Sequence, residues 1–444
     1  MTLRPCYDFP KPNENSVLAR RKASVIVRGA CHELDAVVRL RLLPSPGIEI
    51  EGALPQSSGI VEFDNIGNFA IKGRDIPGFP IRVPLLWPGD GRFVWALKHE
   101  PTLARGTAET EMLCVVFHIF NYNDFHGTRR SIEEGATGRN AICHVDLKAS
   151  GWNVEIKSLS TTADTVKTLR ASGGYGLTHI GSLQKEDGSF FDGKTAEQTL
   201  NALRHFFSFS RGMWCVPCLA VGFDNSKSRV WEAWSSPGGR WASPTSWFDP
   251  HHCDQLVKFF PGFMANWKDA NWRKALHEVI YWYLSSNSST LGLGINIDGG
   301  IILTQAAIER LSFEYVVRER RLIETEGFKN LRASDKIRLL LSSLDIPIDI
   351  PASLPEFRKL AGQFGWLDGP HAITEVRNSL VHPDHKRIGQ FGKAFFPAWS
   401  LGQWYLELAL LRICAYSGTY SNRLVLNKYV GTVEPVPWNE TKAN

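Results

Sequence analysis

The chain has 444 residues, of which 43% are hydrophobic and 21% are charged, so it has the composition of a globular protein with room for two domains. The net charge of +5 is small and the basic residues are dispersed, so charge alone does not argue for a nucleic-acid partner. The 8 scattered cysteines exclude a disulfide framework.

The sequence also argues against a membrane location. No window reaches the roughly 18–20 continuous apolar residues that a spanning helix needs. Residues 1–16 contain three prolines and lack the apolar core of a signal peptide. We therefore expect a reduced, cytoplasmic protein.

Short β-prone runs dominate residues 1–190. Residues 23–28 and 36–42 are rich in Val, Ala and Ile, and residues 47–51 alternate apolar with charged side chains before a Gly/Pro/Ser turn region. Similar runs recur as far as residues 152–156. This density of short strands and turns predicts an antiparallel sandwich or barrel-like module.

One helix is expected within this β-rich module. Residues 195–210 carry Leu200, Leu203, Phe206 and Phe207 at helical spacing, and two aromatic-rich strands follow at 214–223 and 229–234. We interpret the segment as a helix that covers a sheet. The predicted N-terminal module therefore spans residues 1–262. Its strand pattern does not define a function, and we expect it to have a sensing or recognition role beside the helical domain.

From residue 263 to 444 the pattern becomes helical. Six helices are expected between residues 267 and 416, and no strand pattern interrupts them. The predicted fold is therefore multidomain α+β, with a β-rich N-terminal module followed by an all-α helical bundle.

The stretch most suggestive of chemistry is Arg377-Asn378-Ser379-Leu380-Val381-His382, followed by Pro383. On a regular helix, residues five positions apart lie about 7.5 Å apart along the axis and about 140° apart around it, so Arg377 and His382 do not share a face. Either His382 leaves the helix, which a following proline favours, or two subunits share the site.

These side chains suit cleavage of an RNA backbone without a metal. A histidine can transfer the proton of a ribose 2′-hydroxyl or of the leaving 5′-oxygen. A guanidinium binds the phosphate and stabilises the charge that develops on it, and Asn378 adds a neutral hydrogen bond. The predicted catalytic residues are Arg377, His382 and Asn378, with no metal and no cofactor.

The stretch Arg377 to His382 resembles the R-x4-6-H motif of the HEPN superfamily, and the layout resembles bacterial ApeA-like HEPN proteins over residues 266–430. The resemblance implies a helical, metal-independent endoribonuclease that acts as a homodimer in phage defence or a toxin–antitoxin system. The β-rich module would then bind a phage-derived or other trigger.

The resemblance also implies further site residues. In many HEPN proteins an acidic residue on an earlier helix supports the site, and Glu309 and Glu314 are the candidates here, with Glu309 preferred. Lys386 and Arg387 follow the motif closely and are expected to bind the RNA backbone.

Two other functions stay open at this stage. One is a non-catalytic HEPN-like module in which Arg377 and His382 hold a nucleotide or partner, or cap helix carbonyls. The other is a β-sandwich ligand-binding protein whose helical domain only dimerises. Catalysis predicts that the two side chains are exposed, whereas capping predicts that both are bonded to local carbonyls.

Other patterns are weaker. Cys215 and Cys218 have the spacing of a zinc knuckle, with residues 251–253 as possible further ligands, but the apolar strand pattern around them favours buried structural cysteines. The polar residues within 117–127 favour a loop after a buried strand. The tryptophans between 231 and 247 favour packing in the core over stacking on bases or glycans.

Overall fold

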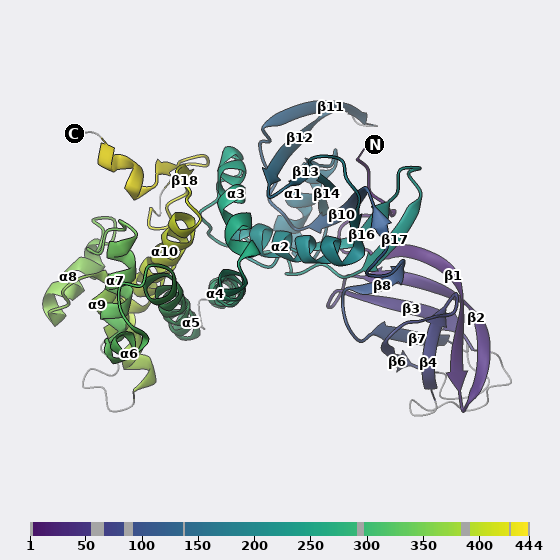
Figure 1. Cartoon of the computed structure of the whole chain (residues 1–444), viewed down its shortest axis with the longest axis horizontal. Coiled ribbons are helices and arrows are strands. Elements are labelled where there is room, and N and C mark those ends of the chain that lie inside the picture. The colour runs from purple at the N-terminus through teal and green to yellow at the C-terminus, as the bar shows by residue number, and fades with distance from the viewer. Residues whose placement is uncertain are drawn as a thin grey trace.

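The N-terminal part of the chain forms an antiparallel sheet of seven strands. The computed structural model describes residues 3–54, 66–83, 92–135, 138–290, 297–382, 391–425 and 428–442. Within these residues the sheet has the order β5-β4-β1-β2-β3-β7-β6, and it forms the curved purple layer in Figure 1. Its strands are β1 (Ser16–Val27), β2 (Ala30–Arg41), β3 (Gly47–Ala53), β4 (Ile66–Ile71), β5 (Arg74–Asp75), β6 (Gly78–Arg82) and β7 (Arg92–Leu97).

A tight turn sets the register of the first hairpin. Arg28 and Gly29 have φ values of +50° and +80°, as in the two-residue turns whose twist matches that of paired strands. The turn brings Val27 opposite Ala30. Because side chains alternate between the two faces of a strand, Val25 and Val27 are both buried on one face.

A second antiparallel sheet of eight strands follows, with the order β11-β12-β13-β14-β10-β16-β17-β8. Its strands are β8 (Thr102–Arg105), β10 (Cys114–Phe120), β11 (Arg129–Gly135), β12 (Gly138–Ala149), β13 (Trp152–Ser158), β14 (Leu177–Lys185), β16 (Pro217–Phe223) and β17 (Arg229–Trp234). The helix α1 (Thr162–Ser172) connects β13 to β14, and β9 (Glu111–Met112) pairs with β15 (Phe191–Asp192).

The helix expected over residues 195–210 is confirmed as α2 (Gly193–Arg211). It begins at Asp192, whose carboxylate accepts the N–H of Thr195 at 2.8 Å, and it ends at Gly212 with φ +74°. Its apolar face, which includes Leu203, Phe206 and Phe207, is buried. The α1 helix, in contrast, was not predicted.

Helices make up most of the remaining chain, at the green and yellow end of Figure 1. They are α3 (Asp254–Lys268), α4 (Ala270–Ser289), α5 (Ile297–Ser312), the π-helical segment η3 (Phe313–Glu319), α6 (Thr325–Asn330), α7 (Ala333–Ser343), α8 (Pro355–Phe364), α9 (Gly369–Val381), the 3-10 turn η4 (Gly392–Ala394), α10 (Phe395–Ile413) and the 3-10 segment η5 (Pro437–Lys442). Among the described residues, every helix is too short or too polar to cross a membrane.

The α+β architecture is as predicted, with differences in detail. The short α6 was not among the six expected helices. The boundary expected at residue 262 lies inside the continuous helix α3, and α3 packs against β12 of the second sheet. In addition, a short ladder of β18 (Thr419–Tyr420) and β19 (Glu434–Pro435) follows α10, where only helix was expected.

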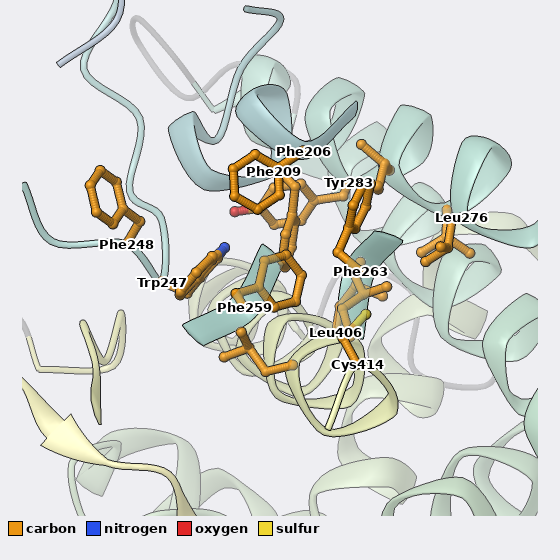
Figure 2. Close-up of a cluster of buried hydrophobic side chains, with 14 of the residues drawn as sticks. Phe206, Phe209, Trp247, Phe248, Phe259, Phe263, Leu276, Tyr283, Leu406 and Cys414 are labelled. Carbon is orange, nitrogen blue, oxygen red and sulfur yellow. The ribbon is translucent and has the colours of Figure 1, made fainter. Parts of the chain in front are cut away.

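One hydrophobic core joins the second sheet to the helices. It contains apolar side chains from β10, β12 and β13 together with those of α2, α3, α4, α5 and α10. Figure 2 shows Phe206 of α2, Phe259 and Phe263 of α3, Tyr283 of α4 and Leu406 of α10 in this core. The opposite face of the second sheet contributes to another core, which it shares with the first sheet. The second sheet therefore lies between two cores.

Candidate functional site

The α9 helix, which carries the Arg377–His382 motif, is fixed at its N-terminal end. Asp368 accepts the N–H of His371 at 2.8 Å and receives Nε and Nη2 of Arg338 at 2.6 and 3.1 Å. The buried side chains of Ala372, Ile373 and Val376 lie at helical spacing, and α9 packs against α5, α7 and α10. The motif therefore sits on a firmly packed helix.

His382 is the residue at which α9 ends. Its backbone is extended, with φ −111° and ψ 108°, while its N–H still donates to the carbonyl of Asn378 at 3.0 Å. Pro383 follows in the sequence and disfavours helical backbone at the residue before it. The His382 side chain is exposed. His382 therefore leaves the helix, as a following proline favours.

Arg377 is half-buried and incompletely bonded. Its Nη1 donates to Oδ1 of Asn378 over a long 3.4 Å, and its buried Nε has no hydrogen-bond partner among the described residues. Capping by Arg377 is not seen among the described residues, because its one hydrogen bond there is to the Asn378 side chain and not to a backbone carbonyl. A buried N–H donor without a partner is energetically costly, and an acceptor that reached it would stabilise the site.

Glu309 lies on α5 and belongs to a different set of contacts. Its Oε1 accepts from Nε2 of Gln305 at 2.9 Å, and its Oε2 lies 3.8 Å from Nζ of Lys336. Glu309 also lines a shallow hollow on the α4–α5 face. Within the described part of the chain, no hydrogen bond or ion pair connects it to Arg377 or His382.

The alternative acid, Glu314, is a buried structural residue. Its Oε2 lies 2.8 Å from Arg310 and 3.1 Å from Arg318, and Arg310 also contacts Glu278 at 2.7 Å. These ion pairs satisfy the carboxylate in the π-helical turn that continues α5. Lys386 and Arg387 lie outside the described residues.

The two cysteines of the Cys215-x-x-Cys218 pattern belong to opposite faces of the second sheet. Cys215 is part of the core shared with the helices, whereas Cys218 is part of the core shared with the first sheet. Burial raises the pKa of Cys215 to about 12 and also raises that of Cys218. Thiols on opposite faces do not converge on one ion, and the described residues contain no group of three metal-ligating side chains.

Several of the remaining polar and aromatic candidates are buried. His118 is fully buried, with Nδ1 bonded to the carbonyl of Leu219 and Nε2 accepting the N–H of Cys6, both at 3.0 Å. Trp231, Trp234 and Trp247 are buried in the two cores, as predicted, whereas Trp241 is only partly buried and lies under the guanidinium of Arg211.

Comparison with known proteins finds two domain models that each match one segment of the chain. Residues 107–244 match the model of the YopA central domain, and residues 269–434 match that of the YopA C-terminal domain. The first match covers most of the second sheet and α2, and the second covers most of the helical region from α4 onwards. The α3 helix lies between the two matched segments.

One curated protein is similar along most of its length. The SPbeta prophage-derived uncharacterized protein YopA of Bacillus subtilis strain 168 is 28% identical over 419 residues, which cover 91% of each chain. No solved structure matches.

Proposed function

We propose that the chain is a metal-independent endoribonuclease of HEPN type, with Arg377 and His382 as the residues that act on the RNA phosphodiester. The observation that carries the proposal is the state of these two side chains at the end of α9. The Arg377 Nε is buried without a partner among the described residues, and the His382 imidazole is exposed. The HEPN resemblance itself rests on the motif and its helical setting.

The roles follow from the chemistry of the two groups. A phosphate oxygen would satisfy the unpartnered Nε of Arg377, and a second oxygen would take an Nη, in the bidentate geometry that guanidinium groups prefer. His382 would remove the proton of the 2′-hydroxyl or protonate the leaving 5′-oxygen. Asn378 already bonds to Nη1 of Arg377 and would orient the guanidinium.

The cellular setting belongs to the same proposal. We place the protein in the cytoplasm as a homodimer, with RNA as substrate and the β-rich N-terminal part as the region that binds a trigger. Phage defence or a toxin–antitoxin role suits this arrangement. The Bacillus subtilis relative is named as a prophage-derived protein, and a prophage origin is compatible with either role.

The test is cleavage of a mixed RNA pool in EDTA by the wild-type chain, Arg377→Ala and His382→Ala. Arg273→Ala and His99→Ala are matched controls, because both side chains are exposed and lie elsewhere in the fold. We expect cleavage to 2′,3′-cyclic phosphate ends by the wild type and the controls, and a loss of about 100-fold or more in the two motif variants.

Equal cleavage by all five proteins would reject the assignment of the site. RNA binding that depends on Arg377, without any cleavage even when a phage lysate is added as a source of trigger, would instead support the non-catalytic binding module.

A further inference from the structure

The neighbouring strands β11, β12 and β13 of the second sheet lie away from α9 (Figure 1). Three polar side chains on these strands form a hydrogen-bonded chain. Ser131 lies on β11, His144 on β12 and Glu155 on β13. The Ser131 Oγ lies 2.9 Å from Nε2 of His144, and Nδ1 of His144 lies 2.8 Å from Oε1 of Glu155. The register brings them together, because β12 pairs with β11 on one side and with β13 on the other.

The hydrogen bonds determine which nitrogen of His144 carries the proton. An ionised carboxylate only accepts hydrogen bonds, so Nδ1 must be the N–H that donates to Glu155. In the neutral imidazole the other nitrogen, Nε2, then holds a lone pair and accepts the O–H of Ser131. An activated serine nucleophile has this arrangement: its hydroxyl donates to a base, and a third group orients that base.

The surroundings hold the imidazole and the carboxylate in place. Nη2 of Arg129 lies 3.1 Å from the same Oε1 of Glu155 and 3.4 Å from Asp146, so a cation faces the carboxylate. Gly127 contacts the His144 backbone so closely that a side chain there would clash with the His144 carbonyl. The side chain of His144 is only 11% exposed, whereas Ser131 is open to solvent.

The position of Ser131 on an edge strand supplies another requirement of acyl transfer. β11 is the first strand of the eight-stranded order, so one side of it is unpaired within that sheet. On such an edge the main-chain N–H groups of alternate residues point away from the neighbouring strand and can donate to a ligand. Donors of this kind stabilise the oxyanion that forms when a hydroxyl adds to a carbonyl.

We propose that Ser131, His144 and Glu155 form a second site, which hydrolyses carboxylic esters whose acyl group is presented from solvent. Ser131 Oγ adds to the ester carbonyl while its proton passes to Nε2 of His144. The C–O bond of the ester then breaks, His144 protonates the departing alkoxide, and an acyl-serine remains. Water adds to the acyl-serine, gives a proton to His144, and releases the acid as Ser131 regains its proton.

The three residues have different roles. Ser131 and His144 contact the reacting atoms and are the catalytic residues. Glu155 is a positioning residue, because it acts through His144 by fixing the tautomer and stabilising the imidazolium. The site is independent of Arg377 and His382, so either proposal can fail while the other holds.

The experiment treats the full-length chain with a fluorophosphonate probe and p-nitrophenyl acetate, and locates the adduct by peptide mass spectrometry. We expect the adduct on Ser131 and no adduct at that site in Ser131→Ala. His144→Ala should slow labelling and ester hydrolysis by about 100-fold or more. Ser226→Ala is the matched control, because Ser226 bonds to Asp224 in an exposed turn without a histidine, and it should react like the wild type.

Glu155→Gln tests the positioning role by a readout that a purely structural residue would not change. Nitrogen-15 NMR of labelled histidine, with the His144 signals assigned through His144→Ala, should show the Nδ1-protonated tautomer in the wild type and lose it in Glu155→Gln. The labelling rate should fall in parallel. An adduct elsewhere, or equal rates in the wild type and His144→Ala, would overturn the proposal.

Discussion

Arg423 and Glu407 form a bidentate ion pair in the interior of the protein, with Nε–Oε2 and Nη2–Oε1 distances of 2.9 and 2.6 Å. Their side chains are 2% and 0% exposed. The hydroxyl of Tyr283 donates to the same carboxylate at 2.6 Å, and Nη2 of Arg423 reaches the carbonyl of Thr245 at 3.1 Å. The pair therefore ties α10 and α4 to the segment that follows the second sheet.

Removing one member of this pair should destabilise the whole molecule. Glu407→Ala leaves a buried guanidinium without a counter-ion, so we expect a loss of about 3–5 kcal/mol in the free energy of unfolding. Arg412→Ala, which removes an exposed ion pair to Asp345, should cost less than about 1 kcal/mol. Urea denaturation followed by tryptophan fluorescence measures both, and similar losses would contradict the role of the buried pair.

The interior also contains a histidine that should make stability depend on pH. His179 is fully buried, neither ring nitrogen has a hydrogen-bond partner within the described residues, and its ring stacks on Phe125. Burial lowers the pKa of His179 to about 3.

His179 is therefore neutral in the folded chain, whereas the unfolded chain binds a proton below a pH of about 6.5. The difference in proton binding stabilises the folded chain fully above pH 6.5, and this stabilisation is lost as the pH falls towards 3. Between pH 4.5 and pH 6 the free energy of unfolding of the wild type rises with pH. We expect this slope to be smaller by about 1.4 kcal/mol per pH unit in His179→Leu than in the wild type. An unchanged slope would contradict this, and the exposed His99→Leu is the control.

The two ends of α9 should respond differently to mutation. Asp368→Ala removes the N-terminal cap and the partner of Arg338, so it should lower the free energy of unfolding by about 2 kcal/mol. Arg377→Ala removes a guanidinium that makes one long hydrogen bond among the described residues, so it should change the free energy of unfolding by less than about 1 kcal/mol. Denaturation midpoints test this difference, and a large loss in Arg377→Ala would indicate a structural role for Arg377.

The buried thiols should resist alkylation. Burial raises the pKa of Cys215 to about 12, so little thiolate is present and access is blocked, whereas Cys31 is exposed. We expect iodoacetamide to modify Cys31 at least about 100-fold faster than Cys215 in the native chain, measured by peptide mass spectrometry. Rapid modification of Cys215 would mean that the sheet opens locally.

The sequence alone predicted several features because their signals are local. Apolar spacing predicted α2, alternation and turn residues predicted the β-rich first half, and Pro383 predicted that His382 leaves α9. In each case the deciding contacts lie within a few residues along the chain. The motif Arg377–His382 was also visible for this reason, since its two residues are only five positions apart in the chain.

Only the tertiary structure decided the features that depend on distant pairing. The α3 helix spans the expected boundary because its apolar face packs with both the sheet and the helices, and periodicity does not specify a partner. Cys215 and Cys218 separate because each enters a different core. Ser131, His144 and Glu155 are 13 and 11 residues apart, and only the register of three antiparallel strands aligns them. Register depends on which faces are buried, and that is settled when the whole chain packs.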